Sequence, residues 1–314
     1  MKNKKILLLI LGFLVILFLT IFAYFRIYQT LPKFAVSLIP EAEIPGQGKT
    51  VLVIVPHEDD EVLGAGGFIE KSIKNGANVM VIFLTNGGGH KFTTQEESRK
   101  LYPKPENYIE SGYQRQQEAK KALAILGLPE NKIIFMGYPD NGLKNLFEEN
   151  FSEPYLSPYT KQNYCSYSNC YHKEAPYTGE NLQNDLEQII KTYFPDLILT
   201  THPSDTHSDH SYCADFVANA IETNPTQPEL YYFIIHFNRF PYPKGLHINR
   251  YLTPPGRLIS SSDEWLKTSL DSDTLELKKQ ALEQYQSQFA SPMLKSLMEG
   301  FLRKNEIFSK AKKR

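Results

Sequence analysis

Two clusters of histidine and carboxylate side chains could carry chemistry in this sequence. The first reads His-Glu-Asp-Asp-Glu from His57 to Glu61 and directly follows the apolar run 51–55. Four adjacent carboxylates repel one another and cannot all lie against a core without a positive partner. A divalent metal ion is such a partner, because it joins His57 to one carboxylate and leaves another free as a base on water. The first cluster therefore predicts a metal-dependent hydrolase.

The second cluster supplies the ligand that the first one lacks. His207 and His210 are three residues apart and flank Asp209, at a junction between a predicted strand and a predicted helix. Lone histidines in loops are usually structural, so the prediction rests on the two clusters together. His57, Asp60 and His210 form a set of two histidines and one carboxylate with an open position for water. Zinc suits this set, and Fe²⁺ stays open as an alternative.

The elements expected to position these clusters alternate between strand and helix. Apolar runs predict strands at 51–55, 79–85, 133–136 and 197–201, and helical periodicity predicts helices at 68–75, 114–126, 182–193, 211–221 and 274–289. This alternation predicts an α/β fold, a Rossmann-like, mostly parallel sheet with helices on both faces. A polar cluster follows each predicted strand. Since ligands bind beyond the carboxyl ends of parallel strands, we expect the clusters to meet at one rim.

The amino-terminal segment has the pattern of a membrane anchor. Three lysines precede an uncharged apolar run from Ile6 to Phe25, and about 20 helical residues span a bilayer core. We expect a single-pass transmembrane signal anchor at 1–28, a tether at 29–50 and a catalytic domain at 51–314. The basic flank predicts that this domain lies outside the cytoplasm, on the periplasmic or extracellular side. A cleaved signal peptide is the alternative.

Charge, cysteines and one long polar segment limit the function further. The formal net charge is -1, which gives no indication of nucleic-acid binding. Cys165 and Cys170 either form a disulfide or are incidental thiols, and Cys213 is expected in the core. The tyrosine-rich segment 143–180 is either an insertion whose tyrosines stack on sugars at the substrate pocket or a surface excursion.

Five motifs in order resemble those of one known family. Pro-His-Glu-Asp-Asp-Glu from Pro56 is similar to the signature of the PIG-L/LmbE-like zinc-dependent N-acetylglucosaminyl deacetylases, and 207–210 is similar to their second histidine motif. Residues 115–127, 138–140 and 278–288 resemble three further motifs of that family. Glu58 departs from the pattern, because the family usually has proline there.

The resemblance implies a role for each matching residue. The implied zinc ligands are His57, Asp60 and His210. The implied catalytic groups are Asp59 as general base, His207 as oxyanion stabiliser or acid, and Asp209 as the group that orients His207. The resemblance also implies that Arg115 and Asp140 lie near the substrate. Asp59 could instead be a structural cap at the strand end.

The implied reaction is zinc-assisted removal of the acetyl group from an N-acetylated amino sugar or its glycan or glycolipid conjugate. The alternatives are another metal-dependent amidase or esterase, and a membrane-anchored glycan-binding protein without turnover. The expected partners are therefore an N-acetylated sugar or glycoconjugate and, through the amino-terminal helix, a membrane.

Overall fold

The computed structural model describes residues 2–89, 94–95, 101–165, 167–225, 227–259 and 264–311; within 2–37, side chains are described for 10–23 and 31–37. In these residues seven strands form one sheet in the order β3-β2-β1-β4-β5-β7-β6. Their bounds are β1 Thr50–Val55, β2 Asn78–Thr85, β3 Ile133–Tyr138, β4 Leu197–Thr201, β5 Glu229–Phe233, β6 Glu264–Ser269 and β7 Asn305–Lys310.

Five of the strands, β3-β2-β1-β4-β5, run parallel, and β7 pairs antiparallel with both β5 and β6. The first four strands confirm the predicted ones to within two residues. The sequence analysis did not predict β5, β6 or β7; polar residues within β6 and β7 leave only two consecutive apolar residues in each. From β1 the chain proceeds to β2 and β3 on one side and then crosses back to β4 and β5 on the other side of β1. The sheet therefore has its topological switch point between β1 and β4.

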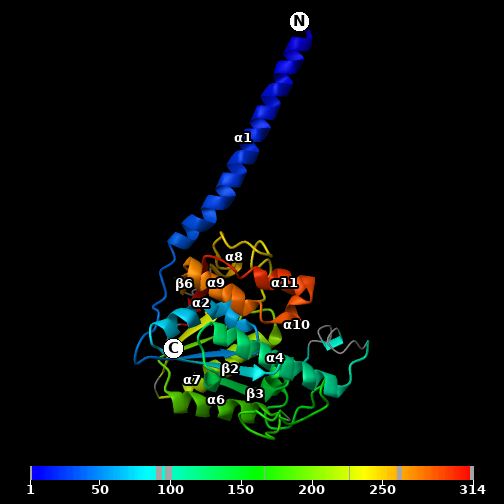
Figure 1. Cartoon of the computed structure of the whole chain (residues 1–314), viewed down its shortest axis with the longest axis vertical. Helices are drawn as coiled ribbons and strands as arrows, with labels where there is room; N and C mark the ends of the chain where they lie inside the picture. The colour runs from blue at the N-terminus through cyan, green and yellow to red at the C-terminus, as the bar shows by residue number, and fades with distance from the viewer. Residues whose placement is uncertain are drawn as a thin grey trace.

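Helices cover both faces of the sheet, as predicted (Figure 1). One face carries α2 Asp60–Lys74, α4 Pro105–Ile125 and α9 Ser272–Leu282, and the other carries α5 Leu143–Glu148, α6 Gly179–Tyr193 and α7 Ser208–Glu222. Shorter elements are η1 Glu130–Lys132, α8 Gly256–Ile259, α10 Gln286–Phe289 and α11 Pro292–Glu299. Side chains of β1 alternate between the two apolar layers: Val53 packs into one and Leu52 into the other, as the two-residue period of a strand requires.

Three predicted helices have clearly different bounds in the structure. Helix α4 begins at Pro105, nine residues before the predicted start at 114. Helix α2 starts at Asp60, eight residues before the predicted start, so the first cluster enters a helix and is not confined to a loop. Three glycines obscured this start, and one of them is required there: a Cβ at Gly64 would lie 2.0 Å from the Phe233 ring. The predicted helix 274–289 is broken, since α9 ends at Leu282 and α10 begins at Gln286.

The amino-terminal helix α1, Lys2–Ser37, projects away from the domain (Figure 1). The first part of the predicted tether at 29–50 is helical, since α1 continues through Pro32 to Ser37. The carboxyl end of α1 is fixed to β6, because Val36 is buried and its carbonyl accepts a bond of 2.9 Å from Lys267 Nζ.

Among the residues whose side chains are described, no helix has the length and apolar character needed to cross a bilayer. The predicted span Ile6–Phe25 lies partly outside those residues, at 6–9 and 24–25. The structure therefore does not support the transmembrane helix, which stays a prediction from the sequence.

Candidate metal centre

The two chemical clusters meet at the switch point of the sheet. His57 lies two residues beyond β1, and Asp60 opens α2. The loop 202–207 follows β4 and leads into α7, whose first turn carries His210. Because β1 and β4 are parallel neighbours, both loops leave the sheet at the same edge. The prediction that the clusters share one rim is therefore confirmed.

Three donor atoms come together at this edge. His57 Nδ1 lies 3.3 Å from His210 Nε2 and 3.4 Å from Asp60 Oδ2. Asp60 Oδ2 lies 3.3 Å from His210 Nε2. Donors about 3.4 Å apart are what a tetrahedral zinc ion with bonds of about 2.1 Å requires. The predicted ligand set therefore has the spacing of a zinc site.

The electrostatics also call for a cation here. Burial favours the neutral ring, but bonds to Asp140, Asp209 and Asp60 raise the pKa of His57 well above its usual value. Burial opposes the ionised form of Asp60 too, yet His210 and His57 hold the pKa of this carboxyl well below its usual range. The buried carboxylates around His57 are therefore stabilised by a nearby positive charge, which a proton or a metal ion can supply.

Two other groups of ligand-type side chains overlap this set. One comprises His57, His207 and His210, and the other comprises His57, Asp140 and Asp209, each with donor atoms within 4.8 Å of one another. In the second group both carboxylates face His57 Nε2, at 3.2 and 3.1 Å. A ligating histidine uses its second nitrogen for an orienting partner. We therefore assign these carboxylates to orientation of His57 and keep Nδ1 for the metal.

The hydrogen bonds of Asp209 do not include His207, the residue that it was predicted to orient. Its Oδ2 lies 3.1 Å from His57 Nε2 and accepts the Asn141 N–H at 2.7 Å, while its Oδ1 accepts the Leu143 N–H at 3.1 Å. These contacts place Asp209 beside His57 and fix the chain beyond β3. The sequence suggested His207 because the two residues are close along the chain.

A residue that the sequence analysis did not single out, Asp205, orients the other histidine. Its Oδ2 lies 3.2 Å from His210 Nδ1 and accepts the N–H groups of Ile235 and His236 at 2.9 Å each. Its Oδ1 accepts the His207 N–H at 2.9 Å. The same carboxylate thus joins the ends of β4 and β5 around His210. Its place within the second cluster was the available signal.

Asp59 has the surroundings of a base and not those of a cap. It precedes α2, but its side chain makes no capping bond, and its φ of 130° is a strained conformation for a residue with a side chain. Burial raises the pKa of Asp59 to about 7, against the opposing charge of Arg115. The structural alternative of a strand-end cap therefore has no support from the contacts.

Arg115 is a buried clamp beside Asp59. It donates to the carbonyl oxygens of Glu58 at 2.5 Å and of Gly87 at 3.0 Å, which joins the loops after β1 and β2. Its Nη2 also lies 3.6 Å from Asp59 Oδ2. Gly87 has a φ of +54°, and a Cβ there would lie 2.3 Å from Arg115. The residue predicted near the substrate thus lines the cavity and lies beside Asp59.

Glu58, the departure from the family pattern, is fully buried, and neither carboxylate oxygen has a hydrogen-bond partner among the described residues. Its Oε2 lies 3.7 Å from Arg115 Nε. Burial raises the pKa of Glu58 to about 8. This side chain therefore adds to the acidic surroundings of Arg115 without touching the three ligand atoms.

A cavity of about 270 Å³ opens beside two of the three proposed ligands, His57 and Asp60, while His210 lies behind its lining. It is lined by the predicted residues His57, Asp59, Asp60, Arg115, Asp140 and His207, and also by Leu63, Asn141, Ile235, His236, Gln288, Leu294, Leu297 and Met298. The apolar wall from α11 and the end of β5 was not predicted, since β5 itself was missed. His236 stands in this wall with its ring 4.9 Å from that of His210.

The remaining motif residues hold the helices that carry the site. Glu118 on α4 accepts bonds from the backbone and hydroxyl of Ser287 at 3.0 and 2.6 Å, which fixes α10 and Gln288 at the cavity. Tyr285 donates to Glu61, next to the ligand Asp60. The buried Lys278 donates to the Leu63 carbonyl at 2.9 Å. These motifs therefore position α2 and the cavity wall.

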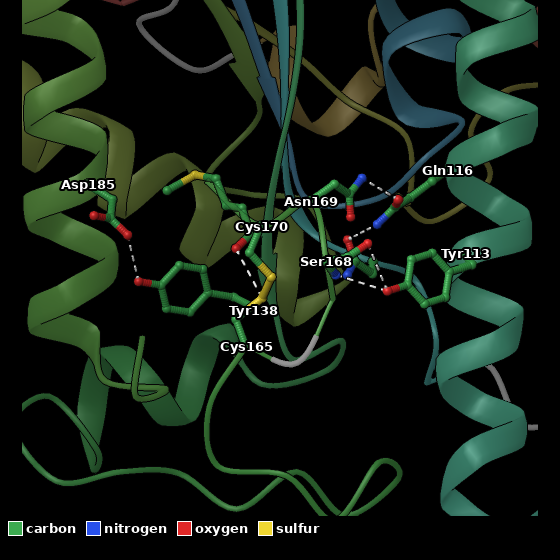
Figure 2. Close-up of a disulfide and its surroundings, with 10 residues drawn as sticks. Tyr113, Gln116, Tyr138, Cys165, Ser168, Asn169, Cys170 and Asp185 are labelled. Carbon is green, nitrogen blue, oxygen red and sulfur yellow. Dashed lines mark hydrogen bonds between the residues drawn. A yellow bond between two sulfur atoms is a disulfide. The ribbon is translucent and has the colours of Figure 1, made fainter. Parts of the chain in front are cut away.

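In the part of 143–180 that the structure describes, the insertion packs beside the cavity and contributes no residue to its lining. A disulfide joins Cys165 to Cys170, so the thiol alternative is excluded, and Cys213 is buried as predicted. Figure 2 shows the disulfide loop between α4 and the Tyr138–Asp185 pair. Asn169 donates to Gln116 at 2.7 Å. The loop is thus attached to α4.

The tyrosines of the insertion divide into two groups. Tyr167 and Tyr177 are buried at 5% and 2% exposure, so they cannot stack on a sugar. Tyr159 lies close to the site. A Cβ placed on Gly89 would lie 2.9 Å from the Tyr159 ring, and the Gly89 N–H donates to Asp140. Only part of the segment is therefore near enough to contact a substrate.

Comparison with known proteins agrees with this geometry. A family model described as "PIG-L: GlcNAc-PI de-N-acetylase" matches residues 52–221, more than half of the 314 residues. This match includes both chemical clusters.

Solved structures show the same fold at low sequence identity. An N,N'-diacetylchitobiose deacetylase from Pyrococcus horikoshii is 20% identical, with a TM-score of 0.53 and coverage of 84% of each chain. The zinc-inhibited form of teicoplanin deacetylase Orf2 is 16% identical, with a TM-score of 0.53, and the match covers 85% of this chain and 100% of that one. A conserved protein from Thermus thermophilus is 18% identical, with a TM-score of 0.50 and coverage of 83% of this chain and 94% of that one.

Proposed function

This chain belongs to the PIG-L family of zinc-dependent deacetylases, and we propose that it removes the acetyl group from an N-acetylated amino sugar or a conjugate of one. The observation that carries the proposal is the triangle of donor atoms from His57, Asp60 and His210, with separations of 3.3 to 3.4 Å. We assign these residues as the metal ligands. A bound zinc ion would polarise the acetyl carbonyl and activate water there.

Asp59 is proposed as the general base that accepts a proton from the attacking water. Its side chain lines the cavity and is not engaged in capping the helix. Arg115, at 3.6 Å, favours the ionised carboxylate and limits its rotation. The strained backbone at Asp59 is then part of the positioning, because it aims the carboxylate at the cavity and not along α2.

His207 is proposed to stabilise the oxyanion and to pass a proton to the amine that leaves. Burial lowers the pKa of His207 to about 4, helped by His57 and His210. A neutral imidazole can donate from one nitrogen and accept at the other. Its side chain lines the cavity, and its buried Nδ1 has no hydrogen-bond partner among the described residues.

The substrate class is proposed from the family and from the lining of the cavity. Asp140 and Asn141 offer polar atoms on one side, suited to sugar hydroxyls, and Leu294, Leu297 and Met298 offer an apolar wall on the other. Such a cavity suits an amino sugar whose aglycone has apolar character. Other acylated amines or esters with the same shape are the alternative.

Acetate release from N-acetylglucosamine conjugates, with and without a chelator, tests the proposal. We expect release that stops with chelator and returns with zinc. A protein that binds the conjugates but releases no acetate at any metal loading would be the glycan-binding alternative. A substrate panel that includes O-acetyl sugars separates amidase from esterase activity.

We also propose, from the sequence, that α1 anchors the domain in a membrane with the domain on the extracytoplasmic side. In the described part of α1, the large apolar side chains between Ile10 and Phe22 are 43–67% exposed, so they do not pack on the domain. A reporter fused after Arg314 tests the orientation. Activity of a reporter that functions only in the cytoplasm would contradict the orientation. Recovery of the protein in the soluble fraction without Met1 would instead support a cleaved signal peptide.

A further inference from the structure

A second cavity, remote from the metal centre, lies at the foot of α1. It measures about 640 Å³ and is formed between the last turns of α1, the loop 242–253 and Lys304. It shares no lining residue with the cavity beside the metal centre. The foot of α1 is a fixed wall, because Lys267 holds the Val36 carbonyl at 2.9 Å.

The groove collects cationic side chains from separate parts of the chain. Lys33 comes from α1, Arg250 from the loop and Lys304 from the turn before β7. None of the residues that line the groove carries a carboxylate. Burial lowers the pKa of His247, another lining residue, and the charges of Arg303 and Arg250 lower it further. The groove is therefore electropositive.

Two of the three cationic residues lie on backbone that the loop holds in place. The Lys304 ammonium lies 5.9 Å from the centre of the Tyr251 ring. The Lys304 N–H donates to the Arg250 carbonyl at 2.9 Å, and the Arg250 N–H donates to the His247 carbonyl at 2.9 Å. These bonds fix the backbone that carries Arg250 and Lys304, while Lys33 lines the groove from α1.

Exposed apolar side chains stand next to these charges. Tyr242, Leu246 and Ile248 line the groove and are 68%, 49% and 43% exposed, and Leu31 and Phe34 on α1 are 59% and 64% exposed. A small inorganic anion would use the charges alone. A phospholipid with an anionic headgroup uses both, because its phosphate meets the cations and its glycerol and upper acyl chains meet the apolar groups.

The place of the groove along α1 suits a lipid headgroup, a step that rests on the proposed anchor. Lys33 lies eight residues beyond Phe25, about 12 Å along a helix axis. The headgroup layer extends roughly 5–8 Å beyond the hydrocarbon core, and attraction between a lysine and a lipid phosphate acts over about 8–10 Å at physiological salt. The groove would therefore face the membrane surface on the side where the domain emerges.

We propose that this groove binds the headgroup of an anionic phospholipid, with Lys33, Arg250 and Lys304 on the phosphate and Tyr242, Leu246 and Ile248 against the apolar portion. Lipid binding there fixes the tilt of the domain on the membrane. It is a binding function separate from catalysis.

Native mass spectrometry of the full chain in a non-ionic detergent tests the proposal without relying on the anchor. Dioleoylphosphatidylglycerol and dioleoylphosphatidylcholine are titrated in parallel. We expect retention of phosphatidylglycerol, with binding about 10- to 30-fold weaker in the double variant Lys33→Gln/Lys304→Gln, since each cation near an anionic lipid contributes about a factor of five. The matched control Lys74→Gln/Lys191→Gln removes the same charge from exposed sites elsewhere and should bind like the wild type.

Two further measurements distinguish a phospholipid site from a simple phosphate site and from non-specific lipid binding. Glycerol phosphate should compete poorly with the phospholipid; equal competition would mean a simple phosphate site. Equal retention of both lipids, or equal loss in the groove and control variants, would overturn the proposal. Lys33 is exposed on α1, so Lys33→Gln alone gives the same test where the double variant does not fold.

The catalytic proposal is judged by a separate measurement. Acetate release in detergent should be the same for the wild type and the groove variants, because the two cavities have no residue in common. Loss of lipid binding with intact turnover would confirm the groove, and lipid binding without turnover in any substrate would reject the catalytic proposal alone.

Discussion

The metal centre and the disulfide-linked insertion are both fixed parts of the domain, but they are fixed in different ways. At the metal centre, contacts between side chains fix the geometry: the buried carboxylates of Asp205 and Asp209 each contact one histidine ring. In the insertion, backbone hydrogen bonds and a disulfide fix the chain. The Tyr171 N–H donates to the Phe135 carbonyl of β3 at 2.9 Å, and the disulfide closes the loop 165–170.

This difference teaches where each region tolerates change. A side-chain network fails when one member is replaced, because its partners are left buried without a bond. A segment held by backbone bonds and one cross-link accepts most side-chain changes, provided its conformation is kept. We therefore expect steep losses at the centre and shallow ones in the insertion.

The largest effect is expected from His57→Ala. It removes a proposed ligand and leaves Asp140 and Asp209 without the ring they share. We expect metal content to fall from near one ion per chain to near zero and acetate release to reach background. Metal analysis of the purified protein checks this. His172→Ala, a half-exposed histidine in the insertion, is the control and should keep its metal; metal retained in His57→Ala would refute the ligand set.

Asp59→Asn separates the base from the ligands. The amide keeps the shape of the side chain but cannot accept a proton from water. We expect kcat to fall about 10²- to 10⁴-fold with metal content unchanged. Steady-state kinetics and metal analysis on one sample check both parts. Asp273→Asn on the outer face of α9 is the matched change, and near-normal kcat in Asp59→Asn would place the base elsewhere.

Asp205→Asn tests whether the missed carboxylate matters. Its Oδ2 both orients His210 and accepts two backbone N–H groups, and the amide can satisfy only some of these bonds. We expect zinc affinity to fall about 10- to 100-fold, as for other orienting partners of metal-bound histidines. Competition with a fluorescent chelator measures this. An affinity within about twofold of the wild type would show that Asp205 only organises the backbone.

The smallest effect on chemistry is expected from the double variant Cys165→Ser/Cys170→Ser. Opening so short a loop costs about 2 kcal/mol in the free energy of unfolding, measurable by denaturant titration. Metal content and kcat should stay close to wild type, because the described part of the insertion does not line the cavity. A tenfold loss of kcat with intact metal would show that the loop supports the active rim through Asn169 and Gln116.

Sequence reasoning was strongest where a short motif follows a strongly apolar strand. The parallel core and the meeting of His57, Asp60 and His210 follow from strand periodicity and from the edge at which parallel strands end. The partners of Asp209 and Asp205 could not be predicted, because they depend on which way side chains turn in one helical turn. The wall from α11 was missed for a related reason, since its place depends on the antiparallel strands that the pattern did not reveal.

The short segment between α1 and β1 has a consequence for handling the protein. β6 is an outer strand of the sheet, and residues 40–42 lie along it: the Ala42 N–H donates to the Lys267 carbonyl at 2.7 Å, and the Lys267 N–H donates to the Pro40 carbonyl at 2.9 Å. A chain shortened to begin at Thr50 would leave that edge open to pairing with other chains. A chain beginning near Leu31 would keep the edge covered, and is the better starting point for a domain that stays dispersed at high concentration.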